Sequence, residues 1–250
     1  MKKCITFLII ILLGCSLLYS QELTRLIDIP TAGILQKGEA SFTISVCKNC
    51  GVSFGAGVGI ISKLMFGIEY GGEYVLGDSV PDGNPSPGVY VKYRIFDESP
   101  KMFAVAIGYD SRGYGAFTDS LYDGTKVNRY EIKSKGLYAA ASKNFNFLGN
   151  LGLHGGINYS ITEKDDDDDL NFFFGIDKSI NSQISLFVEY DFAWNDDKTD
   201  GFGANKGYLN AALYLKLAEN LIMKINFRDL LNNQYKQPDR AITIQYTTNL

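Results

Sequence analysis

The residues whose types suggest chemistry gather around His154, the only histidine of the chain. Asn158 and Ser160 alternate with it along one expected strand, so the three share a face and offer the residue types of a nucleophile, a base and an orienting group. Residues six apart on one strand lie roughly 20 Å apart, so the three cannot meet without help from other strands. We therefore expect a structural histidine and no catalytic residue.

Two other stretches suggest ligand binding. The five consecutive aspartates from Asp165 to Asp169 repel one another, which predicts a solvated, mobile loop tip. Divalent-cation binding is the alternative, although the spaced ligands and the glycine of a calcium loop are absent. The glycine-rich residues 51–59 are not followed by Lys-Ser/Thr or a helix, so we interpret them as a strand with a thin inward side rather than a phosphate cradle.

Cys47 and Cys50 form a C-x-x-C pair. In an exported chain this spacing allows a small disulfide at a hairpin tip. A zinc site would need more ligands than one histidine adds. We expect the two thiols, bridged or free, to be structural, and we expect no metal and no cofactor.

The N-terminus has the pattern of an export signal. Lys2 and Lys3 precede an apolar run over residues 5–18, and Ser20 is a small residue suited to cleavage. Residues 1–20 are therefore predicted to be a cleaved signal peptide, with lipidation at Cys15 as the minority alternative. The formal net charge of −4 argues against a nucleic-acid partner.

The positions of these residues depend on strands, because apolar and polar residues alternate with a period of two along most of the chain. Such runs predict about twelve strands, at residues 41–47, 52–61, 63–70, 89–96, 101–109, 136–143, 151–161, 170–177, 184–192, 208–217, 221–228 and 241–248.

The connections between these runs alternate between short turns and longer loops, which is typical of outer-membrane barrels. We predict an all-β protein with a single antiparallel transmembrane β-barrel of up-and-down meander topology. The barrel would cover residues 39–250, preceded by a periplasmic N-terminal lead-in at residues 21–38.

Two sets of side chains follow from this barrel. One is an aromatic girdle at the bilayer interfaces, where a ring with an apolar body and a wet hydroxyl is favoured. The girdle would contain Tyr70, Tyr109, Tyr159, Tyr190 and Tyr246. The other set lines the lumen, as a solute pathway or as a paired network that fills it. The lumen set is Glu69, Lys92, Arg94, His154, Asn158, Glu189, Asp191, Tyr208, Tyr214, Lys224 and Arg228.

The segment LIDIPTAGILQKGEASF resembles the start of the YjbH-like outer-membrane barrel proteins. In that family a Pro-Thr-Ala segment, here Pro30 to Ala32, precedes a Gly-Glu pair, here Gly38 and Glu39, and the first strand. The resemblance implies an association with exopolysaccharide production, with polysaccharide or export proteins as partners, and it brings no catalytic residues.

We therefore predict a non-enzymatic barrel in a bacterial outer membrane that acts in transport or envelope assembly. Its partners would be the lipid bilayer and the barrel-assembly machinery. Three alternatives remain: a small-solute channel or porin, a lipid-modifying barrel enzyme that depends on His154, and a soluble periplasmic β-sandwich binding protein.

Overall fold

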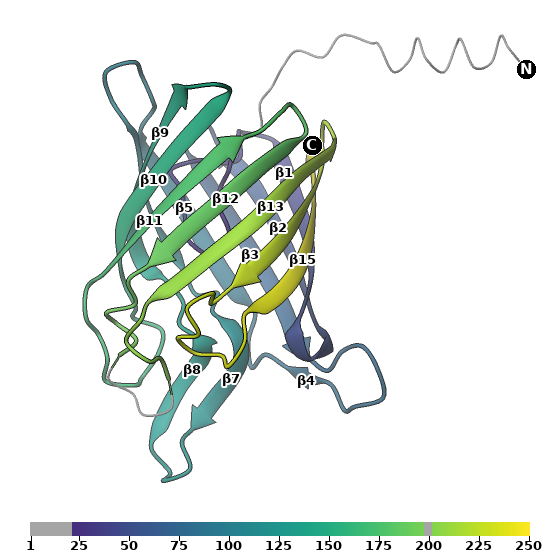
Figure 1. Ribbon diagram of the computed structural model, residues 1–250, viewed down its shortest axis with the longest axis vertical. Coiled ribbons are helices and arrows are strands. Elements are labelled where there is room, and N and C mark those ends of the chain that lie inside the picture. The colour runs from purple at the N-terminus through teal and green to yellow at the C-terminus, as the bar shows by residue number, and fades with distance from the viewer. Residues whose placement is uncertain (1–21, 198–201) are drawn as a thin grey trace, which may run out of the picture.

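In the part of the chain that the structure describes, twelve antiparallel strands form a closed barrel (Figure 1). The structure is a computed structural model and describes residues 22–197 and 202–250. The predicted signal peptide, its cleavage site and Cys15 lie outside these residues. The strands of the wall are β1 (Glu39–Cys47), β2 (Gly51–Ile61), β3 (Leu64–Glu73), β5 (Gly88–Phe96), β6 (Ala104–Asp110), β9 (Gly136–Asn146), β10 (Asn150–Tyr159), β11 (Asn171–Ser179), β12 (Ile184–Asp191), β13 (Tyr208–Ala218), β14 (Leu221–Arg228) and β15 (Asp239–Asn249).

Each strand of the wall pairs with the strands next to it in sequence order, and the first and last strands close the ring. Ile44 of β1 pairs with Ile244 of β15 on one side and with Phe54 of β2 on the other. Closure removes the unpaired strand edges that would otherwise expose backbone donors and acceptors. The predicted all-β meander barrel is confirmed.

The period-two alternation decides which side chains point outward. In β12, Leu186 and Val188 are each 46% exposed, whereas Phe187 and Glu189, which alternate with them, are buried. The same alternation leaves Phe54, Phe66 and other large apolar side chains exposed around the wall. An exposed apolar belt on a closed barrel is the surface that a bilayer requires. No helix among the described residues is long and apolar enough to cross a membrane.

The connections are sorted by length between the two ends of the barrel. At one end, called the short-turn end, turns such as residues 62–63 and 219–220 join the strands. The opposite, long-loop end carries the connections at residues 111–135, 160–170 and 192–207, among others. The first of these contains a hairpin that the sequence analysis missed, β7 (Tyr114–Ser120) and β8 (Lys126–Ile132), which extends beyond the wall at the bottom of Figure 1. The same end carries the turn η1 (Lys48–Cys50) and the short strand β4 (Asp82–Gly83).

Residues 22–37, the lumen segment, lie inside the barrel. This is the stretch predicted to be a periplasmic lead-in, and its apolar side chains Leu26, Ile27 and Ile29 are buried against the inner wall. Inward glycines make room for it: a Cβ added at Gly59 would lie 1.9 Å from the carbonyl oxygen of Gln36. The glycine-rich strand therefore has the thin inner side that its sequence predicts.

Candidate functional site

The lumen segment forms a turn in the middle of the barrel and divides the interior. Arg25 and Pro30 form a β-bridge across the turn. The apolar residues at its tip pack with Phe173 of β11 and Phe187 of β12, which point into the lumen. Further along, Ala32 packs on two alanines of β6, and Ile34 and Leu35 pack on Met65 of β3. The segment thus has a small apolar core of its own inside an otherwise polar lumen.

Cations of β5 bind the two sides of this turn. Lys92 Nζ donates hydrogen bonds to the carbonyl oxygens of Thr24 (2.5 Å), Thr31 (2.9 Å) and Gly33 (3.0 Å). Arg94 Nε donates to the carbonyl oxygen of Ala32 at 3.1 Å, and its guanidinium forms an ion pair with Glu22. Lys92 and Arg94, two neighbouring inward residues of β5, therefore hold both arms of the turn together, from Glu22 to Gly33.

Cations of β14 bind the tip of the turn. Arg228 donates two hydrogen bonds to the carboxylate of Asp28, at 2.8 and 3.0 Å, and Asn210 Nδ2 donates a third at 3.3 Å. Lys224 Nζ donates to the carbonyl oxygen of Leu26 at 3.0 Å. Burial alone would raise the pKa of Asp28, but the positive charge and hydrogen bonds of Arg228 outweigh it and hold this pKa below its ordinary value.

Glu189 of β12 binds the same tip from another part of the wall. Its carboxylate accepts hydrogen bonds from the backbone N–H groups of Ile27 (2.9 Å), Asp28 (2.8 Å) and Ile29 (3.2 Å). Asn210 Nδ2 donates to it as well, at 2.8 Å. The carboxylate thus provides an acceptor for three consecutive backbone N–H groups, which would otherwise be buried without partners.

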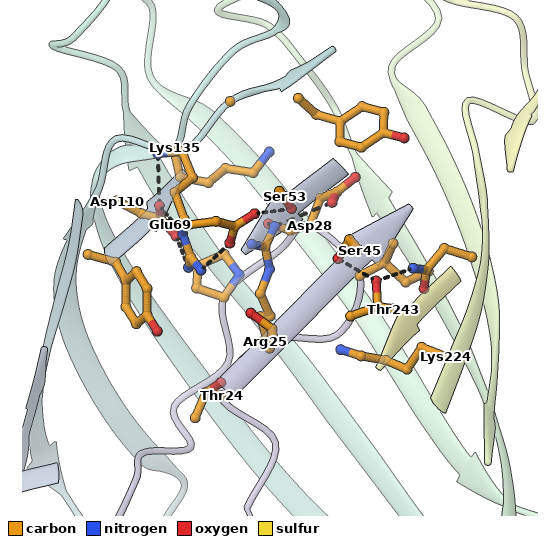
Figure 2. A pocket seen from close by; sticks show the side chains of 18 of the residues that line it. Thr24, Arg25, Asp28, Ser45, Ser53, Glu69, Asp110, Lys135, Lys224 and Thr243 are labelled. Atoms are coloured by element: carbon orange, nitrogen blue, oxygen red, sulfur yellow. Dashed lines mark hydrogen bonds and ion pairs between the residues drawn. The ribbon is translucent and has the colours of Figure 1, made fainter. Parts of the chain in front are cut away.

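One side of the segment borders a cavity of about 120 Å³ (Figure 2), called the basic cavity. Seven lysines or arginines line it, against three acidic residues. The three acidic residues are Asp28, Glu69 and Asp110. In Figure 2, Asp28 and Arg25 of the segment lie in the middle, Glu69 and Asp110 to one side and Lys224 to the other. Inward residues from Ser41 to Cys47 of β1 line it too, so it spans most of that strand.

A second cavity of about 440 Å³, called the vestibule, lies at the short-turn end and is bordered by the opposite face of the segment. Four acidic residues line it, namely Glu22, Glu98, Asp177 and Glu219, against two basic ones, Arg94 and Lys216. The two cavities share no lining residue. The lumen segment therefore separates an acidic compartment from a basic one.

His154 lies in the wall of the vestibule, between Ser142 and Asp177. Ser142 Oγ is 2.8 Å from His154 Nδ1, and Asp177 Oδ1 is 2.8 Å from His154 Nε2. The residue types are those of a hydrolase triad, but the serine meets Nδ1, whereas a serine-protease histidine accepts the proton at Nε2. The N–H of Ala32 also donates to Ser142 Oγ, at 2.9 Å. The chain of hydrogen bonds thus joins three strands and the lumen segment, which is a structural role.

A second serine motif also lacks the geometry of a hydrolase. Residues 51–55 fit the pattern G-x-S-x-G, which in hydrolases places its serine on a sharp strand-to-helix turn. Here the pattern lies within the strand β2, and Ser53 Oγ donates to Glu69 Oε1 at 3.0 Å. The motif has no nucleophile-elbow geometry.

The eleven predicted lumen residues all lie on the inner faces of their strands. Most are buried, and only Glu69 and Tyr214 are partly exposed. They do not form one pathway. Lys92, Arg94, Glu189, Lys224 and Arg228 bind the lumen segment, while Asn158, Asp191 and Tyr208 join a network at the long-loop end.

The network at the long-loop end includes part of the acidic run. The Arg129 side chain is fully buried and forms ion pairs with Asp165 (2.7 Å) and Asp196 (2.6 Å). Lys133 is 2.7 Å from the other oxygen of Asp165. The prediction of a solvated, mobile tip is therefore wrong for Asp165, which pairs with these two cations, and for Asp167, which is fully buried and accepts a hydrogen bond from the N–H of Asp197. No group of carboxylate, histidine or cysteine side chains in residues 22–197 and 202–250 is arranged to hold a metal ion.

The five predicted girdle tyrosines lie on outer faces, and their place at a bilayer interface stays a prediction. Tyr70, Tyr159 and Tyr246 are exposed. The hydroxyl of Tyr109 lies 3.1 Å from Thr162 Oγ1, and that of Tyr190 donates to the carbonyl oxygen of Lys206 at 2.8 Å. Cys47 and Cys50 are separate free thiols at the turn η1, so the predicted disulfide also stays a prediction.

Sequence reasoning found the wall residues but missed their partner. Asp28 is the only charged residue between Leu26 and Gln36, and a lone carboxylate in an apolar run signals a buried cation partner. Ser142 could have been found by continuing the alternation of β9 inward from Tyr138 and Ala140. The contact between Asp177 and His154 could be predicted only with the register between β10 and β11, which no local sequence pattern supplies.

Comparison with known proteins gives the fold. No family model and no curated protein sequence matches the chain. Among solved structures, the chain is similar to the KdgM porin, with a TM-score of 0.52 and 10% identity over 83% of this chain and 98% of that chain. It is also similar to the NanC porin (TM-score 0.44, 10% identity, 84% and 99% covered) and to Omp33 of Acinetobacter baumannii (0.43, 9%, 85% and 97%).

This likeness corrects the family assignment made from the sequence. The solved structure that carries the comparison is the KdgM porin, and neither a family model nor a curated sequence supports a YjbH-like protein, so that assignment is wrong. The Pro-Thr-Ala residues on which it rested lie in the lumen segment, and the Gly-Glu pair lies at the start of β1. The chain is a closed antiparallel β-barrel whose fold is similar to that of the KdgM porin.

Proposed function

We propose that the protein is an outer-membrane channel for small anionic solutes. The observation that carries the proposal is the basic cavity, which follows β1 through most of the barrel and has seven cationic residues in its lining. A cleft with low-dielectric walls and one dominant sign of charge concentrates solutes of the opposite sign. The likeness to the KdgM porin supports the barrel architecture only, because the identity is 10%.

The orientation follows from the loops. In outer-membrane barrels the short turns face the periplasm and the longer loops face outward. The vestibule would then open toward the periplasm and the long-loop network toward the outside. A solute crossing the barrel would pass the lumen segment, so this segment sets the resistance of the channel.

A sealed barrel with a structural task in the envelope is the second candidate, and the apolar core of the lumen segment favours it. Such a barrel would not conduct under any condition that leaves the segment in place. An enzymatic function has no comparable support, because Ser142 and His154 lack the geometry of a hydrolase.

The experiment is the ion selectivity of the purified protein in planar bilayers with unequal KCl concentrations on the two sides. We expect a reversal potential displaced toward that of chloride. Lys224→Gln should reduce the displacement, whereas Lys126→Gln, on the exposed β7–β8 hairpin, should leave it unchanged. If neither the full protein nor a chain lacking residues 22–36 conducts, the channel proposal fails and the sealed barrel is favoured.

A further inference from the structure

We propose that Arg228 and Asn210 form a carboxylate-binding site at which the carboxylate of an entering solute replaces Asp28 and releases the lumen segment. The inference rests on the proposed channel function and adds how that channel opens. In this view the segment is an internal ligand that occupies the site in the absence of solute.

The geometry around Asp28 is that of a bound ligand. The hydrogen bonds that its carboxylate accepts from the barrel wall come from β13 and β14, namely from the amide of Asn210 and the guanidinium of Arg228. The two hydrogen bonds from Arg228 reach both carboxylate oxygens, which is the bidentate arrangement by which arginine recognises carboxylates in general. The site therefore has the geometry to bind a carboxylate from another molecule.

Arg228 also has binding capacity that Asp28 does not use. Its Nη1 atom is buried and has no hydrogen-bond acceptor among the described residues. Buried polar groups nearly always find a partner, so an unpartnered guanidinium nitrogen indicates a missing acceptor. Arg228 lines the basic cavity, so an anion that enters the cavity meets a guanidinium with one donor still unpaired.

The charges that hold the segment make release dependent on an anion. Lys92 and Lys224 form no ion pair within the described ranges, and the segment's carbonyl oxygens are their hydrogen-bond acceptors. If the segment left alone, these two ammonium groups and Arg228 would lose their acceptors inside the barrel, which is strongly unfavourable. Glu189 would lose three N–H donors but keep Asn210. The vacated wall is therefore net cationic, and a polyanionic solute compensates it where a neutral one cannot.

The segment has a fixed point about which it can leave. Gly38 joins it to β1 in a left-handed conformation, with φ of 84°. The N–H of Gly38 donates to the carbonyl oxygen of Gly59 at 2.9 Å, and the carbonyl oxygen of Gly38 accepts from the N–H of Leu250 at 2.7 Å. These bonds hold the base of the segment at the short-turn end, while the contacts of the tip are made by wall side chains that a solute can bind in its place.

The test measures exposure of the tip rather than ion current. Ile27 is 4% exposed, so a cysteine placed there is protected while the segment is docked. The Ile27→Cys protein, with Cys47 and Cys50 changed to serine, is reconstituted in liposomes and treated with a water-soluble maleimide. Succinate is compared with succinamide, its uncharged counterpart of similar shape. We expect succinate to accelerate labelling several-fold and succinamide to have no effect. The same chain without Ile27→Cys gives the background.

Two further variants assign the effect to Arg228. Arg228→Gln should abolish the acceleration by succinate, whereas Arg240→Gln, an exposed arginine of β15, should retain it. Asp28→Asn should label faster than the Ile27→Cys parent without any solute, because the ion pair with Arg228 is lost while Lys92 and Lys224 still hold the segment. This variant decides the matter if Arg228→Gln does not fold.

The outcomes separate this inference from the channel proposal. Equal acceleration by succinamide, acceleration that persists in Arg228→Gln, or slow labelling of Asp28→Asn each overturns the exchange at Arg228. If the thiol introduced by Ile27→Cys stays protected in succinate while the protein conducts anions, that result supports the channel and overturns this opening step. A protein that never conducts overturns the proposed function, whatever the labelling shows.

Discussion

The basic cavity and the vestibule share the lumen segment as a common wall, yet they carry opposite charge. The basic cavity has seven cationic residues against three acidic ones, and the vestibule has four acidic residues against two basic ones. Both are built by the same alternation of inward side chains. The difference teaches that strand periodicity decides whether a residue faces the lumen, while the charge of each compartment depends on which inward residues the barrel brings together.

The largest effect on stability is expected from a pair of adjacent β12 residues that face opposite sides of the wall, one toward the vestibule and one toward lipid. Ser185 lines the vestibule, and Leu186 is exposed on the outer face. Leu186→Arg should lower the free energy of unfolding by up to roughly 2–4 kcal/mol, the cost of a cation at mid-bilayer depth, because an arginine on the outer face meets hydrocarbon and is poorly solvated. Ser185→Arg should cost little and should shift the vestibule toward anion preference. Urea unfolding in liposomes measures the first effect and the reversal potential the second; equal destabilisation would contradict the assignment of faces.

The next effect concerns how firmly the lumen segment, which separates the two cavities, is held in place. Glu189→Ala removes the acceptor of three backbone N–H groups in the lumen segment. A buried donor left without an acceptor costs about 1–3 kcal/mol. Water that enters the space left by the side chain can accept from these N–H groups, so the total cost should stay below that of Leu186→Arg. We expect faster proteolysis of the segment in detergent and a higher single-channel conductance. Unchanged protection of the segment would mean that the apolar contacts alone hold it.

A smaller effect is expected within the vestibule. His154→Ala removes the hydrogen bonds to Ser142 and Asp177, each of which keeps another partner, Ala32 and Asn150 respectively. The loss should be on the order of 1 kcal/mol in the free energy of unfolding. The reversal potential should stay as it is, since the basic cavity does not contain His154. Ester hydrolysis by the wild type that disappears in this variant would contradict the structural role.

The smallest effect is expected from acidification. Burial would raise the pKa of Asp28, but Arg228 outweighs it and lowers this pKa below the ordinary value. A lowered pKa stabilises the docked segment above the ordinary carboxyl pKa of about 4, and the stabilisation is lost as pH falls through the lowered value. Maleimide labelling of the Ile27→Cys protein should therefore accelerate as Asp28 is protonated below about pH 4. The Asp28→Asn variant provides the control, because it should lack this acceleration.

The wall was predictable from local patterns, and the site was predictable in part. Residues 221–228 were placed correctly to the residue, and the other strands of the wall to within three residues at each end. The β7–β8 hairpin was missed because β7, with Tyr114 and Phe117 among small and polar residues, lacks a clear alternation. Asp165 was misjudged because its neutralising partners are Arg129 of β8 and Lys133 directly after it, which are 36 and 32 positions away in sequence.

The sequence by itself determined the strands, their inner and outer faces, and the set of charged residues in the lumen. It could do so because side-chain direction in a strand repeats every two residues, which is a local property. Only the tertiary structure decided that residues 22–37 fill the lumen and that Asp28 meets Arg228, two hundred positions away. An apolar segment is stabilised by any apolar surface that excludes water, so its sequence does not specify which surface covers it.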